Sequence, residues 1–253
     1  MSDFNRNVTA RGGFADRTAA VDAGLRAYML RVYNYMAGAV ALTGVVAWLC
    51  FQNAVVTNEA GAITGLTSFG QMILGGYTPI ILMLATLGLV FFISFRIHTL
   101  QYTTALALFM VYAALLGAAL TSIFVAYTGA SVARVFFISA ASFGALSLYG
   151  YTTQRDPSAM GSFLIMGLFG IIIASLVNIF LKSSGLDWAI SVIGVGVFAG
   201  LTAYDTQRIK EMYDSMDDDG TLSRKAMMGA LSLYLDFINL FLMLLRLFGS
   251  NRN

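Results

Sequence analysis

Seven long apolar stretches constrain this chain more than any other feature of its sequence. Each holds about 20 or more mostly hydrophobic residues, which is the length that an α-helix needs to cross the hydrocarbon core of a bilayer. We therefore predict an all-α, polytopic membrane protein with seven transmembrane helices. The predicted spans are Val32–Phe51, Thr78–Ile97, Thr103–Tyr127, Val132–Tyr151, Ser162–Leu181, Trp188–Gln207 and Ala226–Phe248.

The composition supports a membrane protein and excludes other classes. Hydrophobic residues make up 58% of the 253 residues and charged residues 11%, whereas about a quarter of a soluble domain is charged. The net charge of +2 is too small to indicate a nucleic-acid partner. Residues 1–27 are polar, with interleaved charges, and do not resemble a secretory signal. We expect a cytoplasmic N-terminal segment over 1–27 and one transmembrane domain over 28–250.

The distribution of basic residues predicts the orientation of the chain in the membrane. With a cytoplasmic N-terminus, eleven Lys and Arg residues fall on the cytoplasmic side and four on the other side, which fits the positive-inside bias. The eleven are Arg6, Arg11, Arg17, Arg26, Arg31, Arg96, Arg155, Arg208, Lys210, Arg224 and Lys225, and the four are Arg134, Lys182, Arg246 and Arg252. We expect the N-terminus in the cytoplasm and the C-terminus outside.

Few charged residues fall within the predicted spans, and these are the first candidates for function. A charge in the middle of a span costs on the order of 2.5 kcal/mol or more. Asp236 lies well inside the seventh span, Asp205 lies near the cytoplasmic end of the sixth, and Arg96 ends the second. Ser232 and Asn239 are at helical spacing from Asp236, so the three form a polar stripe that we expect to face the bundle interior.

Asp205 and Asp236 lie in consecutive, antiparallel helices and project from the same half of the membrane. If their carboxyl groups meet away from water, they cannot both ionise cheaply, and the pair is expected to hold one proton. A shared proton would tie the two helices together, and a change in proton count would release them. Arg96 is a candidate for the compensating positive charge. For Asp205 alone, a local pair with Arg208 at i+3 is an equally good interpretation.

Two motifs resemble those of a known family. The segment LYLDFINLFLMLLRLFG at 233–249 closely resembles the C-terminal signature of the Bax inhibitor-1 family, and Tyr204-Asp205-Thr206-Gln207 resembles the family's motif in the preceding helix. The resemblance implies a seven-helix fold with the last helix central, and a calcium leak gated by pH. It implies that Asp205 and Asp236 are the sensor, latched by a basic residue of the second helix, for which Arg96 is the candidate. It also implies, in some relatives, a membrane-bound protease as partner. The Ala and Gly content and the absence of an organelle signal suit a bacterial inner membrane.

We therefore expect a passive leak for Ca²⁺ or other cations, without enzymatic activity or a cofactor. Calcium prefers about six to eight oxygen ligands. Asp205 and Asp236, with Asn239, Ser232 and water, would form only a weak Ca²⁺ site, which suits passage along an ion path. The acidic loop of Asp214, Asp217, Asp218 and Asp219 is either a mouth that attracts cations or an ordinary solvated loop.

Two alternatives stay open. An intramembrane aspartyl protease would place Tyr-Asp in one helix and Gly-x-Gly-Asp in the next. Tyr204-Asp205 fits the first part, but Tyr234-Leu235-Asp236 lacks both glycines. The other alternative is a regulatory membrane partner, for example of a membrane-bound protease.

Overall fold

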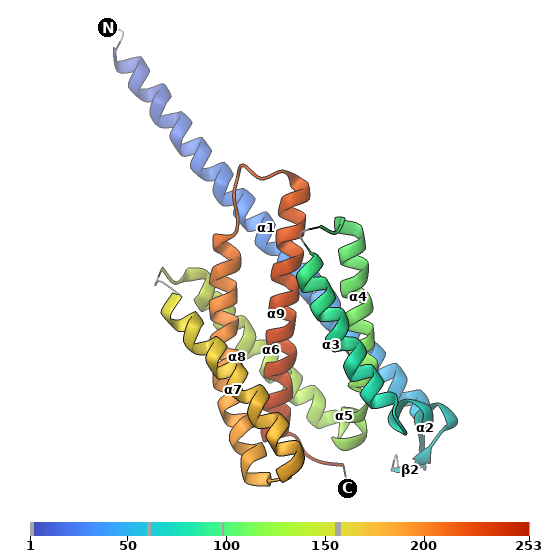
Figure 1. Ribbon diagram of the computed structural model, residues 1–253. Helices are drawn as coiled ribbons and strands as arrows, with labels where there is room; N and C mark the ends of the chain where they lie inside the picture. Colours follow the sequence, from blue (N-terminus) through green and yellow to red (C-terminus); the bar gives the residue numbers. More distant parts are fainter. Residues whose placement is uncertain (1–2, 60–61, 98, 155–157, 253) are drawn as a thin grey trace.

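The computed structural model (Figure 1) describes residues 3–59, 62–97, 99–154 and 158–252, with side chains described from residue 21 onward except those of residues 158 and 159. Seven helical spans in these ranges are long and apolar enough to cross a membrane, so the prediction of an all-α, polytopic membrane protein is confirmed. In chain order the helices are α1 (Asp3–Ala54), α2 (Ser68–Leu74), α3 (Thr78–Arg96), α4 (Tyr102–Ala119), α5 (Thr121–Ala126), α6 (Gly129–Thr152), α7 (Ser158–Leu181), α8 (Ser184–Glu211) and α9 (Asp219–Phe248).

Helix α9 forms the centre of the bundle, as Figure 1 shows. Its most apolar window is 72% buried inside the protein, against 11% for the spans Thr78–Arg96 and Met160–Leu181. It packs against α1, α4, α6 and α8. A helix that is surrounded by protein has to be apolar on nearly all sides, so a polar residue in α9 must find its partner within the bundle.

Both the first and the last predicted spans are parts of longer helices. Helix α1 begins at Asp3 and runs without a break into the first span, and its N-terminal part projects away from the bundle (Figure 1). The stretch contains no proline, and extending an existing helix costs far less than nucleating a new one. Helix α9 begins at Asp219 rather than at Ala226, because Asp218 caps its first turn by accepting from the backbone N–H groups of Gly220 and Thr221.

The third predicted span is two helices in the structure. Helix α4 ends at Ala119, and α5 starts at Thr121. Leu120 between them has ψ of 0°, and its N–H bonds to the carbonyl oxygens of Leu116 and Ala118, which tightens the last turn of α4.

The connector between the first two spans also has structure that hydropathy did not predict. Strands β1 (Val55–Thr57) and β2 (Ile63–Leu66) pair antiparallel, with Val55 opposite Leu66. Thr67 then caps α2 by accepting from the Gly70 N–H at 3.0 Å. The connector therefore forms a small folded layer at one end of the bundle.

Candidate functional site

Asp205 and Asp236 meet inside the bundle. Asp236 projects from the central helix α9 and is 5% exposed, while Asp205 on α8 is half-buried. Their carboxyl groups lie within hydrogen-bonding distance of each other. Helices α8 and α9 also share the most extensive contact between any two elements described.

The early start of α9 explains how two residues at different helical depths come together. At about 1.5 Å per residue, Asp236 lies about 26 Å from the first residue of α9, and Asp205 lies about 9 Å from the last residue of α8. Helix α9 therefore extends beyond the end of α8, as Figure 1 shows. The connector between Glu211 and Asp219 has to cover this difference of about 17 Å between the two helix ends, and its seven residues can do so when extended.

The contact between the two carboxyl groups requires a proton. An ionised carboxylate can only accept hydrogen bonds, and two carboxylates at this distance would repel each other. No hydrogen-bond donor of the described chain reaches the buried Oδ2 of Asp236. Burying an acceptor without a donor costs about 1–3 kcal/mol. A proton shared by Asp205 and Asp236 would remove the repulsion between the two carboxyl groups.

The positive charge next to Asp205 comes from Arg208 and not from Arg96. Arg208 follows Asp205 by one turn on α8 and interacts with it electrostatically. Arg96 is exposed at the C-terminal end of α3, and no ion pair of its guanidinium occurs among the described residues. Helix α3 packs mainly on α4, at the periphery of the bundle. The structure does not bring Arg96 beside the pair, because α3 packs on α4 and not on α8 or α9 to any comparable extent; a latch at Arg96 stays a prediction.

The other members of the predicted polar stripe do not join the pair closely. Asn239 is half-buried, and its amide donates to the Leu235 carbonyl one turn earlier on the same helix at 2.8 Å. Ser232 is also half-buried on α9. No group of three or more His, Cys, Asp or Glu side chains suited to a metal ion occurs in the described ranges. The donor set of Asp205 and Asp236 would thus hold Ca²⁺ only weakly.

A chain of hydroxyl groups next to the pair was not predicted. The Thr206 hydroxyl donates to the Thr202 carbonyl at 2.7 Å and lies 2.9 Å from the Ser147 hydroxyl. Ser147 lies 2.5 Å from the Tyr33 hydroxyl. Because each hydroxyl has one proton, the chain runs from Tyr33 through Ser147 to Thr206. It ties α8 to α6 and α1, and the carboxyl pair ties α8 to α9.

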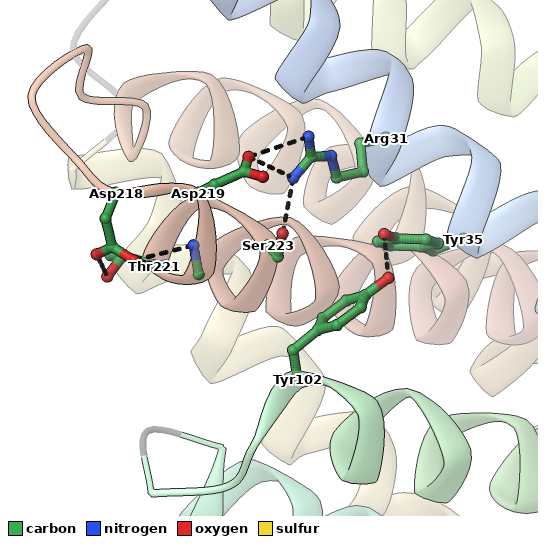
Figure 2. Close-up of polar contacts among 8 residues, drawn as sticks. Arg31, Tyr35, Tyr102, Asp218, Asp219, Thr221 and Ser223 are labelled. Carbon is green, nitrogen blue, oxygen red and sulfur yellow. Dashed lines mark hydrogen bonds and ion pairs between the residues drawn. The ribbon is translucent and has the colours of Figure 1, made fainter.

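Polar contacts also hold α1, α4 and α9 together where α9 begins (Figure 2). The Arg31 guanidinium on α1 lies 3.4 Å from the Asp219 carboxylate and donates to the Ser223 hydroxyl at 2.7 Å. Further along α1, the hydroxyl groups of Tyr35 and Tyr102 are hydrogen-bonded. These contacts join residues more than 60 positions apart, so no local pattern in the sequence could predict them.

The acidic loop has structural partners, which favours the interpretation as an ordinary loop. Asp217 pairs with Lys225 at 2.5 Å, and Asp214 accepts from the Met216 N–H at 2.9 Å. Asp219 pairs with Arg31, as described above. The side chain of Asp218 caps α9 and accepts a hydrogen bond from the Thr221 hydroxyl at 2.5 Å, and these bonds lower the pKa of Asp218.

Comparison with known proteins shows which family and which relatives this chain resembles. The family model described as "Inhibitor of apoptosis-promoting Bax1" matches residues 25–253. The inner membrane protein YbhL of Escherichia coli (strain K12) is 48% identical over 232 residues, which cover 91% of this chain and 94% of that protein. A protein of Rickettsia prowazekii, described as uncharacterised, is 48% identical over the full length of both chains. A protein of Borreliella burgdorferi, also described as uncharacterised, is 44% identical and covers 89% of this chain.

Proposed function

The chain belongs to the Bax inhibitor-1 family, and on that premise we propose that it is a passive, pH-sensitive leak for Ca²⁺ and other cations, gated by Asp205 and Asp236. We place it in a bacterial inner membrane, because its relative YbhL is an inner membrane protein. The basic residues favour a cytoplasmic N-terminus and an external C-terminus.

One observation carries the proposal: two carboxyl groups from neighbouring helices lie within hydrogen-bonding distance inside a membrane-spanning bundle. Acids within spans are costly, and they commonly mark ion pathways and proton relays. Asp236 belongs to the central helix, which packs against α1, α4, α6 and α8. A change of charge at this point therefore acts on the core of the bundle.

The proton count of the pair sets the state of the gate. With one or two protons, the carboxyl groups hydrogen-bond and hold α8 against α9. When rising pH removes the last proton, two negative charges stand about 3 Å apart, which costs about 5.5 kcal/mol at an effective dielectric constant of 20. A bias of about 5.5 kcal/mol inverts a two-state equilibrium from 1:99 to 99:1. The charge repulsion is thus large enough to part the helices and open the leak.

The separated pair would also attract the permeating cation. Two carboxylates supply fewer oxygen atoms than the six to eight that Ca²⁺ prefers. Water completes the coordination of the ion, so it is held weakly and passes on. Passage without tight binding is what a leak requires.

The experiment is Ca²⁺ entry into liposomes that contain the purified protein and a trapped calcium dye, at a series of pH values. The native protein should leak faster as pH rises. The double variant Asp205→Asn, Asp236→Asn should lose this pH response, because amides do not titrate in the range. The variant Asp22→Asn, which removes an exposed carboxylate of α1, should behave like the native protein. An unchanged pH response in the double variant would overturn the proposed gate.

A paired aspartate geometry also occurs in aspartyl proteases, so that alternative needs its own test. Asp236 is buried at the bundle centre, and Tyr234-Leu235-Asp236 lacks the two glycines of the intramembrane enzymes. We therefore propose a protein without enzymatic activity. Cleavage of a model membrane substrate that disappeared in Asp236→Asn would contradict this. The regulatory alternative, binding to a membrane-bound protease, is compatible with a leak and can be tested by pull-down from native membranes.

A further inference from the structure

An apolar groove lies between α1 and α6. Its volume is about 520 Å³, and the residues that line it include Gly44 and Trp48 of α1, Phe136 of α6, and Phe237 and Phe241 of α9. Tertiary contact between α1 and α6 is slight compared with that between α1 and α4 or α6 and α8. In a membrane, such a groove is filled by an apolar chain, because an empty groove forfeits the van der Waals contacts of its walls.

The groove has one charged lining residue among those described, Arg252. Its guanidinium carbon lies 5.2 Å from the centre of the Phe51 ring. Its Nε is buried, and no acceptor of the described chain reaches it. A buried donor without an acceptor is costly, and the cation lies at an otherwise apolar surface. The groove therefore offers a positive charge and a free donor to an anion.

The chain end is fixed in this position by the fold. The Arg252 N–H donates to the Ala126 carbonyl at 2.8 Å, and the Ser250 N–H donates to the Ser131 hydroxyl at 2.8 Å. The Thr128 N–H donates to the Ser250 carbonyl at 3.1 Å. Residues 250–252 are thus pinned to the junction of α5 and α6, near the end marked C in Figure 1. The position of Arg252 beside the groove is built in by backbone hydrogen bonds.

We propose that this groove binds an anionic phospholipid, with an acyl chain along Trp48, Phe136 and Phe241 and the phosphate on the Arg252 guanidinium. A soluble anion would satisfy the guanidinium and leave the apolar walls uncovered, whereas a zwitterionic lipid would fill the groove without a net charge for Arg252. Guanidinium groups match phosphate geometry closely. An anionic lipid satisfies both parts of the site at once. The inference does not depend on the proposed gate.

The two tryptophans of the chain, Trp48 and Trp188, allow a direct test. Trp48 lines the groove and is 49% exposed, and Trp188 lies on α8, outside the groove, and is 64% exposed. The full-length Trp188→Phe variant reports on the groove, and the full-length Trp48→Phe variant reports on a lipid-exposed site outside it. Each is placed in liposomes of unlabelled lipid that contain either phosphatidylglycerol or phosphatidylcholine with brominated acyl chains. Bromine quenches a nearby tryptophan, so the two curves give the relative affinity for the two lipids.

We expect Trp48 to prefer phosphatidylglycerol by about five-fold, the contribution of one basic residue near anionic lipid. The preference should fall to near one in Arg252→Gln. It should persist in the control variant Arg246→Gln, because Arg246, near the C-terminal end of α9, pairs with Asp187 and does not line the groove. Gly44→Phe should reduce quenching of Trp48 by both lipids, because a Cβ at Gly44 has open space around it and a larger side chain can fill the groove. Equal quenching of Trp48 by both lipids, an equal preference at Trp188, or a preference that survives Arg252→Gln would overturn the proposal.

Discussion

Gly150 lies where the backbone of α6 packs directly on α8, and its replacement by alanine tests this packing. A Cβ at Gly150 would lie 2.2 Å from the Ala203 carbonyl oxygen, whereas ordinary contacts begin at 3.4 Å. The obstacle is backbone, so the two helices must part by about 1.2 Å. Ser147 and Thr206 lie one turn away on the same two helices, and their 2.9 Å hydrogen bond would lengthen beyond the limit for such a bond.

The magnitude follows from three contributions. Overpacking costs about 1–3 kcal/mol, and the lost hydroxyl hydrogen bond costs about 1 kcal/mol. Replacing glycine by alanine within a helix stabilises the folded state by about 0.5–1 kcal/mol. We therefore expect Gly150→Ala to lower the free energy of unfolding by about 1–3.5 kcal/mol.

The assay is reversible unfolding in detergent micelles, followed by circular dichroism during titration with a denaturing detergent. Gly144→Ala is the matched control, since Gly144 lies on the same helix and a Cβ there meets nothing within 4 Å. The control should be as stable as the native protein or up to about 1 kcal/mol more stable. If Gly150→Ala proved as stable as Gly144→Ala, the close approach of α6 to α8 would be refuted.

Two further substitutions test the contacts of α9. Tyr234→Phe removes a fully buried hydroxyl that lies 2.6 Å from the Thr43 hydroxyl, so it should cost about 1 kcal/mol in the same unfolding assay, whereas Tyr149→Phe at an exposed position of α6 should cost nothing measurable. Asp218→Ala should lower the thermal stability at neutral pH, because the ionised side chain caps α9. Its hydrogen bonds to Thr221 lower the pKa of Asp218 below the ordinary value of 3.8, so this stabilisation is complete above the ordinary value and is lost as pH falls through the lowered one. The melting temperatures of native protein and Asp218→Ala should therefore converge in strong acid, and a constant difference would contradict the capping role.

The membrane spans could be predicted because lipid requires a strong hydropathy signal in the sequence, whereas the central position of the last helix was expected only from the resemblance to the family. A span needs an unbroken apolar run, and a costly acid such as Asp236 stands out within it. The parts of the helices that extend beyond the membrane give no such hydropathy signal. Residues 219–225 of α9 are polar enough to escape a hydropathy analysis, although their early start is what aligns Asp236 with Asp205.

Contacts between distant segments could not be predicted from one sequence. The closeness of Arg208 to Asp205 follows from their i+3 spacing on one helix, whereas only the packing of α3 decides how near Arg96 comes to the pair. No sequence pattern marks Tyr33, Ser147 and Thr206, whose hydroxyl groups come together only in the folded protein. Arg252 near the chain end likewise gives no sign in the sequence that it reaches a groove beside Phe51.

The central claim is that Asp205 and Asp236 hold a proton between them in the closed state. Infrared spectroscopy of the protein in liposomes, with pH changed stepwise, detects this proton through the C=O stretch of a protonated carboxyl group. Near neutral pH we expect such a band in the native protein, its loss as pH rises in step with the onset of Ca²⁺ flux, and its absence in the Asp205→Asn, Asp236→Asn double variant. A native spectrum without a protonated carboxyl at any pH at which the leak is closed would contradict the account.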